Sequence, residues 1–82
     1  MKTFADLKIG TVVNYKDMAN NQDYVVLDKV VDKYGNVNIN VLNKESNWID
    51  HEAAYTEVVD QNEEKPFDVR WRIVSTPWDI KE

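Results

Sequence analysis

Cysteine is absent from the 82 residues, while glycine, proline and histidine occur only twice, twice and once. Without cysteine the chain forms neither a disulfide framework nor a thiolate zinc site, so folding must rest on packing and backbone pairing. This composition fits a reducing, cytoplasmic setting. The two glycines, Gly10 and Gly35, are too few for a phosphate-binding glycine loop or a dinucleotide fingerprint.

Long apolar runs are also missing. No stretch approaches the ~20 apolar residues that cross a bilayer, and the opening MKTFADLKIG lacks the continuous apolar core of a signal peptide. We therefore expect a cytoplasmic protein without membrane contact. An apolar fraction of 43% is typical of globular proteins. Because no repeat or linker interrupts the chain, we predict a single domain over residues 1–82.

Positive charge is missing from one segment, residues 45–64. This segment holds seven acids and no lysine or arginine, whereas all ten bases and the other eight acids lie outside it. The net charge of −5 is therefore concentrated in one part of the sequence. Seven carboxylates without a base repel one another, so they serve either solubility or the binding of a basic partner.

The residues needed for catalysis are sparse. His51 is the sole histidine, and neither Ser46 nor Ser75 lies in a nucleophile elbow. Asp50, His51 and Glu52 offer three ligand types in a row, but sequence neighbours point in different directions and rarely reach one ion. Carboxylate pairs in so short a chain lack the deep pocket that tunes an acid and a base. We predict a protein without enzymatic activity, cofactor or metal.

The sequence does contain the pattern of short strands. Runs rich in β-branched and aromatic residues occupy 11–16, 23–31 and 36–43. Gly35 and Asn36 separate the last two runs and tolerate the positive φ of a hairpin. We therefore expect antiparallel pairing across this turn.

Strict alternation marks two of the runs, 36–43 and 67–75. In the first, Val37, Ile39 and Val41 share one face and asparagines the other. The second reads FDVRWRIVS, and its apolar face consists of Phe67, Val69, Trp71 and Ile73. The opposite face consists of Asp68, Arg70, Arg72 and Val74. Side-chain alternation thus predicts a buried Trp71 with Arg70 and Arg72 facing away from it.

The stretch SNWIDHEAAYTEVVD fits two interpretations. Asn47 is a candidate helix cap and the apolar residues that follow share a helical face, whereas 54–60 alternates as a strand does. We predict a helical turn at about 48–53 followed by a strand at about 55–60.

Five short strands with frequent turns predict a mainly β fold, a small five-stranded antiparallel barrel with a short helical turn. The opening FADLKIGTVV resembles the lead-in of SH3-like barrels, where an apolar turn and a glycine precede the first strand. The residues in those places are Leu7, Ile9, Gly10, Val12 and Val13. The resemblance implies an SH3-like fold and no particular activity.

The acidic segment suggests a non-enzymatic module that binds a basic protein. The chain is similar in size, acidity, lack of cysteine and asparagine content to small inhibitors of phages and mobile elements. Such inhibitors occupy the basic nucleic-acid-binding surface of their target. The predicted contact residues are Trp48, Glu52, Tyr55, Glu57, Asp60, Glu63, Glu64 and Trp78.

The alternative function is nucleic-acid binding by a β-barrel through Arg70, Arg72 and exposed aromatic rings. The lysines expected near them are Lys16, Lys29 and Lys33. Acidity of the whole chain, with a pI near 4.7, argues against this function.

Each of these side-chain sets also has a purely structural interpretation. The arginines then form a solvated face paired with Asp28 or Glu57 across strands. Trp48 and Trp78 then cap an open end of the barrel.

Overall fold

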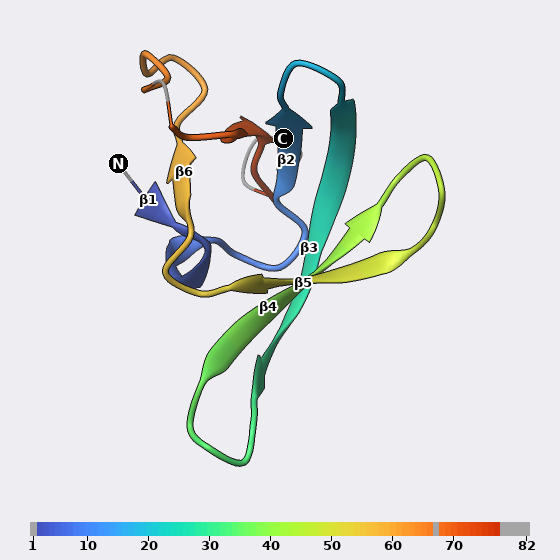
Figure 1. Cartoon of the computed structure of the whole chain (residues 1–82), viewed down its shortest axis with the longest axis vertical. Helices are drawn as coiled ribbons and strands as arrows, with labels where there is room; N and C mark the ends of the chain where they lie inside the picture. Colours follow the sequence, from blue (N-terminus) through green and yellow to red (C-terminus); the bar gives the residue numbers. More distant parts are fainter. Residues whose placement is uncertain (1, 67, 78–82) are drawn as a thin grey trace.

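The computed structural model describes residues 2–66 and 68–77, and just over half of them lie in β-strands. Within this part of the chain, seven strands form one open, mixed sheet in the order β1-β6-β7-β2-β3-β4-β5 (Figure 1). The strands are β1 (Lys2–Thr3), β2 (Val12–Lys16), β3 (Asn21–Val31), β4 (Val37–Asn43), β5 (Ile49–Ala53), β6 (Glu57–Val59) and β7 (Trp71–Ser75). The mainly β prediction is confirmed, whereas the closed five-stranded antiparallel barrel is wrong.

Strands β2 to β5 form an antiparallel meander, as the hairpin signals predicted. In the turn between β3 and β4, Gly35 has a φ of 86° and its N–H donates to the carbonyl of Asp32. The Asp32 carboxylate accepts the backbone N–H groups of Tyr34 and Asn36 at 2.8 and 2.9 Å. These hydrogen bonds lower the pKa of Asp32, the bond from Asn36 most of all. The hairpin projects from the rest of the fold (Figure 1).

The two-residue alternation holds in both runs that showed it. Ile39 and Val41 in β4 are buried, with 3% and 0% of their surfaces exposed. In the second run Val69, Trp71 and Ile73 are buried while Arg70 is exposed and Arg72 half-buried. Regular strand begins only at Trp71, and Phe67 lies outside the described residues.

The helical turn predicted at 48–53 is wrong, because these residues form strand β5 along β4. Asn47 is not a helix cap: it takes a φ of 64° and reverses the chain. Asn43 stabilises this reversal, since its buried side-chain oxygen accepts the N–H groups of Glu45 and Ser46 at 2.8 and 3.0 Å. A ladder along β4 supplies more hydrogen bonds than a single helical turn, so tertiary pairing overrides the local signal.

The other end of the sheet departs from the antiparallel prediction. β6 runs parallel to β7, with Val58 opposite Trp71, and β1 pairs antiparallel with β6. A parallel pair needs a long connection, which residues 60–70 provide. The predicted strand at 55–60 is therefore present as the shorter β6.

The helical turn of the fold lies near the start of the chain, in the 3₁₀ turn η1 (Phe4–Asp6). The N–H groups of Phe4 and Ala5 donate to the carbonyls of Thr56 and Ala54, both at 3.0 Å. η1 thus contacts the link between β5 and β6, while β1 and β5 remain unpaired with each other at the two ends of the sheet. In the described part of the chain no helix is long and apolar enough to span a bilayer.

The lead-in to β2 has the predicted apolar turn and glycine. Gly10 has a φ of 95°, and its N–H donates to the carbonyl of Val26 at 2.9 Å. Leu7 packs against the core, whereas Ile9 is 69% exposed. The glycine therefore works as expected, and the SH3-like resemblance stays a prediction.

The core is centred on Trp71. Its indole makes edge-to-face contacts with Phe4, Tyr15 and Tyr24, at centroid distances of 5.0, 4.9 and 5.2 Å. The buried cluster around it consists of Phe4, Val13, Tyr24, Val26, Ile39, Val41, Val58 and Ile73. Trp71 therefore joins η1, β2 and β3 from the centre of the sheet.

Candidate functional site

The acids of residues 45–64 are divided among separate parts of the fold. Glu45 lies in the β4–β5 turn, Asp50 and Glu52 in β5, Glu57 in β6, and Asp60, Glu63 and Glu64 in the β6–β7 loop. The β4–β5 turn and the β6–β7 loop lie on opposite sides of the molecule (Figure 1). The segment that is continuous in sequence is therefore not one continuous acidic surface.

The β6–β7 loop is held by hydrogen bonds within it and by side chains from both ends of the chain. Lys2 forms an ion pair with Asp60 at 3.1 Å, and the Glu63 carboxylate accepts the N–H of Asp60 at 3.1 Å. Arg72 donates through Nη1 to the carbonyls of Asp60, Gln61 and Glu63 at 3.1, 3.1 and 2.8 Å. Arg72 therefore anchors the loop.

Strand β5 keeps two of the acids together. Asp50 lies opposite Val41 and Glu52 opposite Ile39, so both carboxylates are on the core-facing side of the last strand. Glu52 is half-buried, and its pKa is raised by this burial and then by the negative charge of Asp50. The pair forms a small acidic rim along the end of the sheet.

The main chain of β5 pairs with β4 on one side, and on its other side the described part of the chain offers no hydrogen-bond partner to the main-chain groups of Ile49 and His51. In the β4–β5 ladder the N–H of Asn43 donates to the carbonyl of Trp48 at 2.8 Å, and hydrogen-bonded pairs recur at every second residue from there. Ile49 and His51 occupy the alternate positions. Their N–H and C=O groups therefore face the open edge of the sheet, which we call the β5 edge.

Two aromatic residues flank the β5 edge. Trp48 precedes the strand with 74% of its surface exposed, and Tyr55 follows it with 82% exposed. The interpretation of Trp48 as a core cap is therefore wrong. Trp78, the third aromatic residue of the predicted contact set, lies outside the described residues.

His51 faces the opposite side of β5 from its acidic neighbours, where its Nδ1 contacts the side-chain oxygen of Asn40. Across residues 2–66 and 68–77 no group of three or more histidine, aspartate or glutamate side chains is placed to hold a metal ion.

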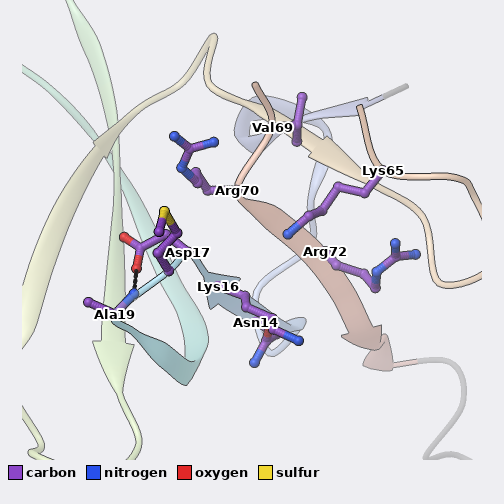
Figure 2. A pocket seen from close by; sticks show the side chains of 9 residues that line it. Asn14, Lys16, Asp17, Ala19, Lys65, Val69, Arg70 and Arg72 are labelled. Atoms are coloured by element: carbon purple, nitrogen blue, oxygen red, sulfur yellow. Dashed lines mark hydrogen bonds between the residues drawn. The ribbon is translucent and has the colours of Figure 1, made fainter. Parts of the chain in front are cut away.

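A second feature was only partly anticipated. A hollow of about 790 Å³, here called the cationic pocket, is lined by Asn14, Lys16, Asp17, Met18, Ala19, Lys65, Val69, Arg70 and Arg72 (Figure 2). The sequence pointed to Lys16 and both arginines, but it gave no signal for Lys65, which comes from the β6–β7 loop. Lys29 and Lys33, also expected there, do not line the pocket.

Arg72 has different neighbours from those expected of a cross-strand ion pair. It lies opposite Asn14 on β2 and Val59 on β6, so Asp28 and Glu57 are not its pairing partners. Because the acceptors of its Nη1 are neutral carbonyls, the positive charge of Arg72 is not cancelled by these hydrogen bonds.

Asp17, the one acid among the described residues that line the cationic pocket, is bound within its own turn. One oxygen of Asp17 accepts the N–H groups of Ala19 and Asn20 at 2.8 and 2.7 Å, and the other accepts the hydroxyl of Tyr15 at 3.0 Å. The N–H of Ala19 is the main cause of the lowered pKa of Asp17. The hydrogen bond that the Tyr15 hydroxyl donates to Asp17 is the main cause of the raised pKa of Tyr15.

Comparison with known proteins finds no matching family model, no matching curated protein and no matching solved structure. Two features of the structure itself, the β5 edge and the cationic pocket, point to what the chain could bind.

Proposed function

We propose that the chain is a non-enzymatic protein-binding module whose β5 edge receives an extended, basic segment of a partner protein as an additional strand. The observation that supports this most directly is the unpaired main chain of β5. Ile49 and His51 present donors and acceptors in the spacing of a β-ladder. Strand addition uses such groups for affinity and the adjacent side chains for specificity.

Charge determines the kind of strand that fits. Asp50 and Glu52 point to the same side of β5, so an added strand places every second side chain beside a carboxylate. Lysine or arginine at those positions gains a favourable cross-strand pair, whereas an acid there is repelled. The half-buried Glu52 is the more sensitive of the two, because its charge is already costly in the free protein.

The same charges disfavour a second copy of this chain as the added strand. Antiparallel pairing of two β5 strands brings the acidic rims of the copies together, and like charges facing each other across strands are destabilising. Lysine, proline and bulges, which commonly protect edge strands, are missing from β5. In their place the carboxylates of Asp50 and Glu52 would prevent edge-to-edge pairing of two copies by repulsion, while a basic segment could still pair with the edge.

Trp48 and Tyr55 add apolar contact area at the two ends of the strand. Exposed aromatic residues supply much of the binding energy in protein interfaces, and these two lie where an added strand would begin and end. The partner contact is therefore centred on Trp48, Glu52 and Tyr55, whereas Glu57 in β6 and Glu64 in the β6–β7 loop lie outside it. A partner that uses the same basic segment for nucleic acid would lose that contact on binding here.

A short peptide of alternating lysine and threonine is the probe for this proposal. Binding is followed by amide hydrogen exchange, and we expect the N–H groups of Ile49 and His51 to exchange more slowly in the complex. The variant His51→Pro removes one outward N–H and leaves the β4–β5 hydrogen bonds in place, so it should abolish binding. His51→Ala keeps the N–H and is the matched control.

Two results would contradict the proposal. One is equal peptide affinity of the proline and alanine variants at His51, and the other is protection of amides outside β5 alone. A double variant, Asp50→Asn with Glu52→Gln, gives a second test that leaves the backbone unchanged. It should weaken binding of the lysine peptide and leave binding of a serine–threonine peptide unaltered.

A further inference from the structure

The cationic pocket concentrates positive charge in a protein that is acidic overall. Four of the ten bases of the chain line one hollow, and Asp17 is the one carboxylate among its lining residues in 2–66 and 68–77. Like charges held close together repel one another, and a bound anion relieves this repulsion. The arrangement thus favours a ligand of opposite charge.

The cations come from different parts of the chain and are held in different ways. Arg72 is fixed by its hydrogen bonds to the β6–β7 loop. Figure 2 shows Arg70 and Lys65 on different sides of the hollow, with the ammonium of Lys65 directed into it. Lys16 belongs to the end of β2. Strands β2 and β7 therefore carry two of the four charges, and the β6–β7 loop carries the other two, Lys65 and Arg70.

Two of these cations are available to a ligand. Within residues 2–66 and 68–77, no hydrogen bond or ion pair involves the ammonium group of Lys16 or Lys65. Asp17 keeps its negative charge, because the groups of Ala19, Asn20 and Tyr15 that donate to its oxygens are neutral, but within the described residues it forms no ion pair with either lysine. The two lysines are thus free to supply charge-assisted hydrogen bonds.

We infer that the cationic pocket binds a small ligand carrying at least two phosphate groups. Its volume of about 790 Å³ falls in the range of roughly 300–1,000 Å³ found for small-molecule sites. Asp17 is the one carboxylate among the described lining residues, and the ammonium groups of Lys16 and Lys65 have no ion-pair partner there, so a diphosphate can pair with both lysines. Met18, fully exposed at the rim, offers an apolar contact for the remainder of such a ligand.

A nucleic-acid strand fits the pocket less well than a small phosphate ester. Strand binding normally combines a basic groove with stacking on aromatic rings, but Trp48, Tyr55 and Tyr34 are exposed elsewhere and do not line the pocket. A long polyanion would also be repelled by the rest of the protein, which has a net charge of −5. A compact ligand inside the hollow is farther from those acids, and salt screens much of their repulsion.

Calorimetric titration with inorganic pyrophosphate at low salt tests the inference, with a single-stranded oligothymidylate as the second probe. We expect pyrophosphate to bind. Lys16→Glu and Lys65→Glu should each raise its Kd by about tenfold or more, since each removes a charged hydrogen-bond donor. Lys33→Glu makes the same charge change in the distant β3–β4 turn, and screening should keep its effect below about threefold.

Three outcomes would overturn the inference: no pyrophosphate binding, an equal loss in the Lys33→Glu variant, or binding of the oligonucleotide that is tighter than that of pyrophosphate and sensitive to the same lysines. The last would assign the pocket to nucleic acid instead. Far-ultraviolet circular dichroism of each variant confirms that the sheet is intact. The result is independent of the β5 edge, because the lysine peptide and pyrophosphate report on different residues.

Discussion

Strands β5 and β7 are both five residues long, yet β5 ends the sheet and β7 lies between two neighbours. In β7 Trp71 and Ile73 are buried, and Trp71 makes the central contacts of the core. In β5 no side chain is fully buried, and one side of its main chain is open. Position in the sheet therefore separates a strand that stabilises the fold from one that is available for binding.

The largest effect in this comparison should come from Trp71→Ala. Removing a buried indole that touches three other rings leaves a cavity at the centre of the core, and we expect a loss of about 3–5 kcal/mol in the free energy of unfolding. Urea denaturation followed by circular dichroism measures it. Trp71→Phe should cost clearly less. Equal losses for both variants would show that the ring contacts are not what stabilises β7.

Arg72→Ala should have the next largest effect. The variant leaves three loop carbonyls without their donor, so we expect a loss of about 1–2 kcal/mol in the free energy of unfolding. Faster hydrogen exchange confined to residues 60–66 would locate the change in the loop. Lys33→Ala, a base removed from an exposed turn, should leave unfolding unchanged. A loss of similar size in that control would contradict the loop-anchoring role of Arg72.

Glu52→Gln should have a smaller, pH-dependent effect. The pKa of Glu52 is raised above its ordinary value of 4.5, so the folded state binds the proton more tightly than the unfolded state does. The wild-type protein therefore loses stability relative to the variant as the pH rises through 4.5 and above the raised pKa. Melting temperatures compared from about pH 4 to about pH 7 should show the variant gaining at the neutral end. A constant difference across this range would contradict the burial of Glu52.

Trp48→Ala should have the smallest effect on stability. Because the ring is mostly exposed, we expect a change within about 0.5 kcal/mol in the free energy of unfolding. Affinity for the lysine peptide should nevertheless fall, which separates binding from folding in β5. Tyr34→Ala, at another exposed ring, is the control for the peptide titration. A large loss of stability in Trp48→Ala would show that the indole packs on the fold.

The predictions that held depend on burial of one face. In β4 and β7 apolar and polar residues alternate because the odd-numbered side chains enter the core. This alternation can be recognised in the sequence without knowing which strands lie next to each other. Gly35 was equally readable, since a hairpin needs positive φ at that position. Both features can be predicted because they depend only on residues close together in the sequence: a turn residue that tolerates positive φ, or a strand with one apolar face.

The predictions that failed depend on pairing between distant residues. The signal around Asn47 suggested a helix, but β4 needed a partner strand and residues 49–53 supply it. The path of the long β6–β7 loop brings Lys65 close to Lys16 and Arg70. No sequence pattern predicts that path. The sequence likewise contains no pattern that predicts the parallel pairing of β6 with β7. The seven-stranded order, and hence the open edge at β5, therefore required the structure.

The position of β7 in the middle of the sheet has a consequence for folding. It is the last of the described strands in sequence, yet it separates β6 from β2. Until it inserts, the aromatic rings of Phe4, Tyr15 and Tyr24 have no indole to close around. We therefore expect the meander of β2 to β5 to form early, because its contacts are short-range in sequence. Strands β1, β6 and β7 should then pair late and in a single cooperative step.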